Sequence, residues 1–373
     1  MTTILSVFGT RPEAIKMAPV VQAIRAEATL RGLVCVTGQH RGMLDSVLQG
    51  FGITPDHDLD IMRPGQDLTW ITTAVLERLR DLLARVKPDW LLVHGDTTTA
   101  MAAALAGFYA GVKVAHVEAG LRSWDLTRPW PEEMNRVVID KVAQLFFAPT
   151  AGARDNLLRD NCAPDRIVVT GNTVIDALLT TRARIEGDAA LRASLEAQLP
   201  GLDASRRIIL VTGHRRESFG PPLAAMCRAL ARLAERPDTQ LVYPVHLNPN
   251  VQAPVRHLLA ERPHVHLLPP MDYLPFVHLM MRASLVVTDS GGVQEEAPSL
   301  GKPVLVTREV TERPEAVAAG TVELVGTDEE TIVARAAALL DSPSAYARFA
   351  RAHNPYGDGM AASRIVARLL AEG

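Results

Sequence analysis

The sequence ILSVFGTRPEAIKMAPVVQAIRA, residues 4–26, joins a strand pattern to a helix pattern through a glycine turn. Ile4–Phe8 is a short apolar run, which is typical of a buried strand. Glu13–Ala26 is an amphipathic stretch, and Thr10 and Glu13 have the spacing of a capping box, so Thr10 is predicted to be the helix N-cap. A strand, a glycine turn and a capped helix start together predict an anion site at the carboxyl edge of a parallel sheet.

Short apolar runs and helical stretches keep alternating along the chain. Further strands are predicted at Leu33–Thr37, Trp90–His94, Val112–Val117, Leu145–Ala148 and Ile167–Thr170. The pattern pauses at Thr181–Arg206, which is charged and Ala-rich and predicts a helix plus a linker. Strands are then predicted at Ile208–Thr212, Leu241–Val245, Val265–Leu268, Leu285–Thr288, Val304–Thr307 and Val322–Val325. This alternation predicts parallel sheets covered by helices on both faces.

The fold class predicted is α/β, with two doubly wound Rossmann-like domains facing a cleft. A length of 373 residues exceeds one typical domain. We expect an N-terminal domain at residues 1–172 and a C-terminal domain at residues 173–355. The tail, residues 356–373, contains the helical segment Asp358–Leu370 and is expected to pack back on the first domain.

Composition excludes several classes of protein. The formal net charge of −3 argues against a nucleic-acid binder or a protein that binds acidic membranes. Cys35, Cys162 and Cys227 are scattered, so the sequence suggests neither a disulfide framework nor a zinc site. No apolar stretch reaches the ~18 residues that span a bilayer, and the N-terminus lacks signal-peptide features. A cytoplasmic protein is therefore expected.

The second domain contains a candidate phosphate site that matches the first. Asp289-Ser290-Gly291-Gly292 follows the predicted strand Leu285–Thr288, and paired glycines allow close approach of a phosphate to backbone N–H groups. Glu296 lies about one turn into the next helix, where a carboxylate can bind ribose hydroxyls. Arg11 and Lys16 supply cations at the first site. The alternative is that these residues are ordinary helix starts with solvated charges.

Four ionisable residues stand near predicted strand ends or helix starts. They are Asp96, Glu118, Glu132 and His214. The carboxyl ends of parallel strands share one edge of a sheet, so these side chains are predicted to collect in a ligand crevice. Three of them also have a structural explanation: Asp96 as a helix cap, Glu132 as a first-turn carboxylate and His214 as a loop histidine. Phe276 is either a core aromatic or a surface on which a base stacks.

Nine segments in order along the chain resemble the bacterial non-hydrolysing UDP-N-acetylglucosamine 2-epimerases, which have the two-domain GT-B fold. They are Phe8–Pro19, His94–Thr99, His116–Arg122, Pro129–Glu133, Gly171–Leu178, Thr212–Ser218, Tyr243–Val251, Thr288–Val304 and Thr311–Ala316. The resemblance implies that UDP lies between the domains. The residues implied around the substrate are Arg11, Lys16, Asp96, Glu118, His214, Met271, Phe276, Ser290, Gly291, Gly292, Glu296 and Arg313. The family usually has a polar residue where this chain has Met271.

The resemblance also implies a reaction. UDP is eliminated to leave 2-acetamidoglucal and is added back with protonation of C2 on the other face, giving UDP-N-acetylmannosamine for cell-surface polysaccharide. Asp96, Glu118, Glu132 and His214 are the implied catalytic residues, and the sequence does not assign acid and base among the carboxylates. No cofactor or metal is expected, and the family suggests a homodimer. The alternatives are a glycosyltransferase of the GT-B fold, a hydrolysing 2-epimerase, an inactive UDP-sugar sensor, and an epimerase of a modified UDP-N-acetylglucosamine.

A second UDP-N-acetylglucosamine activates some members of this family through a Gln-His-Arg-Gln segment and a more distant basic residue. The corresponding segments here are Gln39-His40-Arg41-Gly42 and Arg63-Pro64-Gly65-Gln66. Glycines 42 and 65 replace a polar and a basic side chain, while Arg63 could substitute in part. Weak or absent activation is therefore expected.

Overall fold

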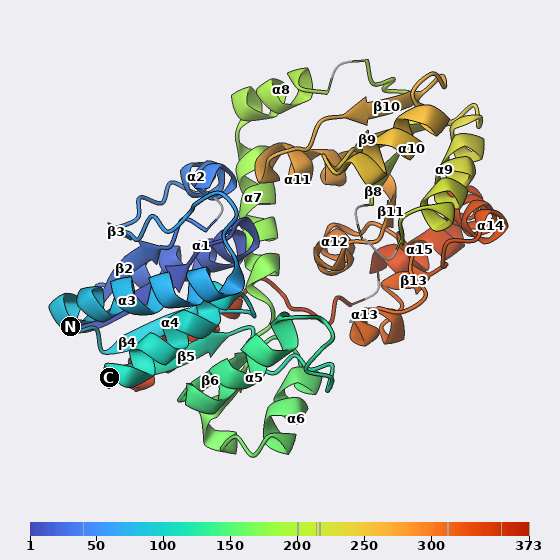
Figure 1. Ribbon diagram of the computed structural model, residues 1–373. Coiled ribbons are helices and arrows are strands. Elements are labelled where there is room, and N and C mark those ends of the chain that lie inside the picture. The colour runs from blue at the N-terminus through green and yellow to red at the C-terminus, as the bar shows by residue number, and fades with distance from the viewer. Residues whose placement is uncertain are drawn as a thin grey trace. The chain divides into compact units, whose positions relative to one another are not determined.

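The computed structural model describes residues 1–39, 41–199, 201–213, 215, 218–311, 313–351 and 353–372. The chain divides into two compact units; in Figure 1, unit 1 runs from blue to green and also includes the red C-terminal segment, and unit 2 contains the colours from green to orange-red between them. Unit 1 contains Met1–Ala177 together with Tyr356–Gly373, and unit 2 contains Leu178–Pro355. The chain therefore passes between the units twice.

Unit 1 is built on a parallel sheet whose described strands number seven, in the order β3-β2-β1-β4-β5-β6-β7. The strands are β1 (Thr2–Phe8), β2 (Leu30–Val36), β3 (His57–Asp58), β4 (Trp90–His94), β5 (Lys113–Val117), β6 (Leu145–Ala148) and β7 (Ile167–Val169). The helices are α1 (Arg11–Ala26), α2 (Arg41–Gly50), α3 (Leu68–Val86), α4 (Thr98–Tyr109), α5 (Glu132–Val142), α6 (Ala151–Arg159), the short η1 (Pro164–Arg166) and α16 (Ala361–Ala371). The order of the strands reverses between β1 and β4, so ligands are expected at the carboxyl ends of those two strands.

Unit 2 repeats this plan with a parallel sheet whose described strands number six, in the order β10-β9-β8-β11-β12-β13. The strands are β8 (Arg207–Thr212), β9 (Thr239–Pro244), β10 (Val265–Leu268), β11 (Ala283–Thr288), β12 (Val304–Val306) and β13 (Val322–Leu324). The helices are α8 (Ala189–Ala197), α9 (Pro221–Ala234), α10 (Pro249–Leu259), α11 (Tyr273–Arg282), α12 (Gly291–Glu296), η3 (Ala297–Leu300), α13 (Pro314–Ala318), α14 (Glu329–Asp341) and α15 (Pro343–Arg351). Its order reverses between β8 and β11.

Helix α7 (Thr173–Gly187) begins in unit 1 and ends in unit 2. Near its start, the Asp176 carboxylate accepts hydrogen bonds from the backbone N–H groups of Ala361 and Ala362, at 3.2 and 2.8 Å. Asp176 thus supplies partners for N–H groups in the first turn of α16 that have none within the helix. The last helix of the chain is attached in this way to the segment by which the chain leaves unit 1.

The prediction of an α/β fold with two parallel sheets is confirmed, and so is Thr10 as the N-cap of α1. Three details differ from the sequence prediction. Neither the edge strand His57–Asp58 nor the start of α7 at Thr173 was predicted. The segment expected to be one helix and a linker holds the end of α7 and the separate helix α8. Within the described residues, no helix combines the length and apolar character needed to cross a membrane.

Candidate functional site

The loops after β1, β4 and β5 meet at the switch point of the unit 1 sheet. Arg11, the first residue of α1, is half-buried after β1, Asp96 follows β4, and Glu118 follows β5. Gly9 must be a glycine here, because an added Cβ would lie 2.0 Å from Thr37 Oγ1. The backbone of the first loop therefore packs directly against the neighbouring strand end.

Glu118 is the most enclosed of the predicted carboxylates. Its residue is 8% exposed, and its backbone has a left-handed φ of 65°. Lys16 donates a hydrogen bond to Oε2 of Glu118, and Asn172 Nδ2 donates to the same oxygen at 2.9 Å. His94 Nε2 lies 3.6 Å from that oxygen. Polar groups from α1, from β4 and from the loop before α7 thus lie around one carboxylate oxygen.

The charges around Glu118 keep it ionised. Burial raises the pKa of Glu118, but the positive charge of Lys16, together with His94, outweighs burial and holds the pKa well below its ordinary value. Glu118 is consequently an anion at neutral pH. A buried carboxylate in this state can accept a proton from a bound molecule.

Lys16→Met is expected to move the acid limb of the kcat/KM profile to higher pH. Removing the cation leaves burial, which raises the pKa of Glu118, so the carboxylate takes up its proton at a higher pH than in the parent protein. Activity that needs the anion is then lost earlier as the pH falls. The measurement is kcat/KM against pH, with Lys113→Met, at the opposite end of β5, as control. An acid limb that does not move would show that Lys16 does not set this ionisation.

Asp96 is held from α5. Its carboxylate Oδ2 accepts hydrogen bonds from Arg136 Nε at 3.0 Å and Nη2 at 2.5 Å, and Asn135 Nδ2 donates to its backbone carbonyl at 2.8 Å. The interpretation of Asp96 as a helix cap is wrong, because Thr97 is the N-cap of α4 and accepts from Ala100 N at 3.0 Å. Arg136 also pairs with Glu133, so the guanidinium is itself fixed.

Glu132 is the first residue of α5, one turn before Arg136. One carboxylate oxygen, Oε2, is buried and has no hydrogen-bond partner among the described residues. The first-turn position agrees with the structural explanation, but a buried acceptor without a donor is costly and suggests a missing partner. Since α5 also holds Asp96, the structure brings Glu132 to the same end of the sheet as Asp96 and Glu118.

A buried cluster of His116, Asp140 and Arg122 stabilises this end of the sheet. His116, fully buried, contacts the Asp140 carboxylate at 2.5 Å through Nδ1 and the Gly95 carbonyl at 2.7 Å through Nε2. Arg122 donates to Asp140 at 2.6 Å. Burial raises the pKa of Asp140, but His116 and Arg122 outweigh it and lower that pKa. The cluster fixes the backbone between His94 and Asp96.

Unit 2 gathers two arginines at the glycine turn after β11. A Cβ added to Gly291 would lie 3.3 Å from Arg313 Cζ and 3.6 Å from Arg215 Nη2. Arg313 Nε donates to Glu295 at 2.7 Å, whereas Arg215 Nε is buried with no hydrogen-bond partner in the described part of the chain. Like charges this close repel unless an anion joins them. The glycine turn consists of Ser290, the N-cap of α12, and Gly291 and Gly292, the first two residues of that helix, and it is therefore a candidate anion site.

Arg215 was missed by the sequence analysis, although it lies in the segment Thr212–Ser218 that carried the resemblance. Its backbone N–H donates to Asp289 Oδ2 at 2.8 Å, which ties the loop after β8 to the loop after β11. The two strands are neighbours at the switch point of this sheet. His214, predicted to be catalytic, lies outside the described residues.

The remaining predicted residues of unit 2 lie around α11 and α12. The Tyr273 hydroxyl donates to Glu296 Oε1 at 2.8 Å, so α11 orients the carboxylate expected to bind ribose. Burial, followed by the Glu296 charge, raises the pKa of Tyr273 well above its ordinary value and keeps it a donor. Phe276, on α11, and Met271, just before it, are both half-buried. Phe276 is thus not a fully buried core aromatic.

The segments of the expected second site lie together in unit 1. Gln66 Nε2 donates to the Gln39 carbonyl at 3.1 Å. The Arg41 guanidinium pairs with Asp58 and, at 2.6 Å, with Asp60. Arg63 Cζ lies 3.5 Å from the ring centroid of Trp70. Both cations already have partners; His40 lies outside the described residues.

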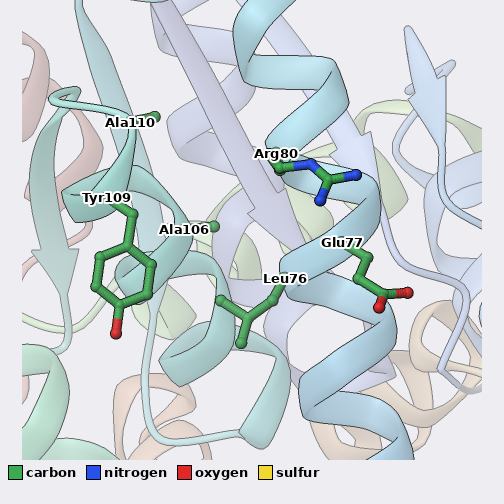
Figure 2. Close-up of a pocket in the computed structure, with 6 residues that line it drawn as sticks. All are labelled: Leu76, Glu77, Arg80, Ala106, Tyr109 and Ala110. Atoms are coloured by element: carbon green, nitrogen blue, oxygen red, sulfur yellow. The ribbon is translucent and has the colours of Figure 1, made fainter.

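A separate hollow of about 370 Å³ lies on the surface of unit 1 (Figure 2). Leu76, Glu77 and Arg80 of α3 and Ala106, Tyr109 and Ala110 at the end of α4 line it. Asp96 precedes the opposite end of α4. The hollow is therefore distinct from the candidate site, which lies where α4 begins.

Known proteins resemble this chain along nearly its whole length. A family model described as UDP-N-acetylglucosamine 2-epimerase matches residues 22–370. The chain is 57% identical over 367 residues to the UDP-N-acetylglucosamine 2-epimerase of Escherichia coli O157:H7, covering 98% of each protein. It superimposes with a TM-score of 0.93 on the Neisseria meningitidis UDP-GlcNAc 2-epimerase bound to UDP-GlcNAc, at 48% identity, covering 99% of this chain and 100% of that one. A Methanocaldococcus jannaschii UDP-GlcNAc 2-epimerase in complex with UDP-GlcNAc and UDP gives a TM-score of 0.82 at 31% identity, covering 100% of both chains. The chain therefore belongs to the UDP-N-acetylglucosamine 2-epimerases, a family of isomerases.

Proposed function

We propose that the protein epimerises UDP-N-acetylglucosamine by eliminating UDP and adding it back. The supporting observation is Glu118, a buried carboxylate held ionised by Lys16 and His94 at the switch point of unit 1. In the forward reaction a carboxylate takes the C2 proton while the C1–O bond to phosphate breaks. The electron pair of the C–H bond forms the C1=C2 double bond of 2-acetamidoglucal, and UDP leaves as an anion. Re-addition reverses these steps with a proton delivered to the opposite face.

The carboxylates have different roles in this proposal because their surroundings differ. Glu118 is the proton acceptor because its surroundings favour the anion. Asp96, fixed by Arg136, and Glu132, with one unpartnered oxygen, are the candidates for transfer at the other face. His214 remains the fourth candidate, as the resemblance implies. The product would be UDP-N-acetylmannosamine for cell-surface polysaccharide, and the homodimer implied by the family stays a prediction.

Unit 2 would bind the UDP part of the substrate. Arg215 and Arg313 approach the glycine turn closely enough to contact a diphosphate there, and Glu296, oriented by Tyr273, is available to ribose hydroxyls. Phe276 is a candidate stacking surface for uracil. Cationic support of this kind stabilises charge that develops on the departing phosphate.

Solvent deuterium is expected to appear at C2 of both epimers when the enzyme turns over UDP-N-acetylglucosamine in deuterated water. Each turnover breaks the C2–H bond and forms a new bond with a proton from a group that exchanges with solvent. Proton NMR during turnover measures the label. Epimerisation with no deuterium at C2 would exclude this mechanism, and steady release of free UDP would indicate a hydrolysing enzyme instead.

Purified UDP-N-acetylmannosamine alone is expected to react without a lag. In this chain glycines replace two side chains of the second site, and Arg41 and Arg63 are engaged by Asp58, Asp60 and Trp70. A lost hydrogen bond to a charged group costs about 1.5–3 kcal/mol, or roughly 10- to 150-fold in affinity. The measurement is the initial rate with and without a trace of UDP-N-acetylglucosamine. A long lag that the trace abolishes would show a working second site.

A further inference from the structure

The chain leaves unit 1 along α7 and returns to it at Tyr356. Asn172 contacts both of these passages and also Glu118, the proposed proton acceptor. It follows β7 and stands immediately before α7, 3% exposed. Its Nδ2 donates to Glu118 Oε2 at 2.9 Å, and its Oδ1 accepts from Val174 N at 3.0 Å. The side chain therefore caps α7 through its oxygen and donates to Glu118 through its nitrogen.

The backbone of Asn172 is held from the second passage. Its N–H donates to the Tyr356 carbonyl at 2.6 Å, and Tyr356 is the first residue after the chain returns to unit 1. A Cβ added to Gly171 would lie 3.2 Å from Gly357 Cα, so two glycines let these backbones approach closely. Gly171 has φ of +88° and Gly357 of +131°, which side chains other than glycine rarely adopt.

We propose that Asn172 is a positioning residue for Glu118, the carboxylate that accepts the C2 proton. Its hydrogen bond fixes the orientation of that carboxylate, and Asn172 is itself held by α7 and by Tyr356. The inference rests on the proposed role of Glu118. Lys16 contacts the same oxygen from a long, flexible side chain, whereas Asn172 is a short amide whose other groups are already bonded. A fixed donor keeps the carboxylate in one orientation, and proton transfer requires an accurate approach of the reacting atoms.

Asn172→Ser tests this role without removing the acceptor that caps α7. Serine is as good an N-cap as asparagine, but it cannot present Nδ2 to Glu118. We expect kcat to fall about 10- to 100-fold, in the range for a lost hydrogen bond to a charged group, while KM for UDP-N-acetylglucosamine changes less than about threefold. In a Glu118→Gln background the same change should cost little more, because Asn172 acts through Glu118. Full kcat in Asn172→Ser, or an equal further loss in the Glu118→Gln background, would overturn the proposal.

Asn172→Asp provides a second readout that a capping role would not move. Aspartate also caps helices well, but it places a like charge beside Glu118 and raises the pKa of that carboxyl. The side chains shown to face Glu118, the Lys16 cation of α1 and the His94 ring of β4, stay unchanged. The acid limb of kcat/KM should move to higher pH in Asn172→Asp; an unmoved limb would count against the contact.

Asp188→Ser is the matched control, because Asp188 is the exposed N-cap of α8 and accepts from Leu191 N at 2.9 Å. It should lose stability to a similar small extent and keep its kcat. Failure of the inference is distinguishable from failure of the proposed function. If Glu118→Gln keeps its rate, the role of Glu118 is wrong; if Glu118→Gln is inactive and Asn172→Ser is fully active, the positioning role is wrong.

Discussion

Glu118→Gln is expected to lower kcat by about 10²–10⁴-fold while the affinity for UDP changes little, since a lost general base typically costs this much in rate. Glutamine matches the shape of glutamate and can still accept from Asn172, so the fold around it is expected to persist. The amide cannot take a proton from C2. Steady-state kinetics and UDP titration together separate the chemical step from binding.

Asp96→Asn and Glu132→Gln extend the same test to the other face of the sugar. Both should lower kcat far more than they weaken UDP binding, because both carboxylates belong to unit 1 and the diphosphate contacts are proposed for unit 2. Glu77→Gln, an exposed position on α3, is the control for the substitution itself. A variant of Asp96 or Glu132 with near-parental kcat would remove that residue from the proton transfers.

Most of the fold could be predicted because parallel strands are buried on both faces. Such strands are continuous apolar runs, as in Leu145–Ala148, where every residue is buried. The two-residue edge strand His57–Asp58 has no such run, since its residues are polar and only half-buried or exposed. The start of α7 was missed for a different reason. Its first turn lies in Gly171–Leu178, a segment interpreted only through its family resemblance.

The candidate site, too, could be predicted only in part. Asp96, Glu118 and the Ser290–Gly292 turn follow predicted strands directly, so their positions could be inferred from topology. The groups that control them come from distant parts of the chain. Arg136 reaches Asp96 across 40 residues, and Asn172 reaches Glu118 across 54. Neither pairing has a spacing that one sequence displays, because each depends on which helix covers which strand end.

Arg215 shows the limit of motif reasoning. The segment Thr212–Ser218 carries the family resemblance, which implies a role for His214 and none for the neighbouring Arg215. What singles out Arg215 is its approach to Gly291, 76 residues later, together with Arg313. The convergence of two guanidinium groups on one glycine is visible only in three dimensions.

Replacing both Arg215 and Arg313 by methionine is expected to weaken UDP binding by about 10²–10⁴-fold. Each charge-assisted hydrogen bond to phosphate contributes about 1.5–3 kcal/mol, or roughly 10- to 150-fold in affinity, and the total falls short of the simple product because neighbouring effects are not additive. Methionine keeps much of the apolar stem. Isothermal titration with UDP at constant salt measures the loss, since salt weakens exposed charge contacts.

The two single variants should differ in stability while both lose affinity. Arg313→Met leaves the buried Glu295 carboxylate without the Nε donor at 2.7 Å, so a fall in the free energy of unfolding is expected; Glu295→Gln in the same chain should restore part of it. Arg215→Met removes a guanidinium whose Nε has no partner in the residues described, so its stability should change less. Arg228→Met, which breaks an exposed pair with Glu329 on the surface of unit 2, is the control for charge. If the double variant bound UDP as tightly as the Arg228→Met control, the glycine turn of unit 2 would not be the diphosphate site.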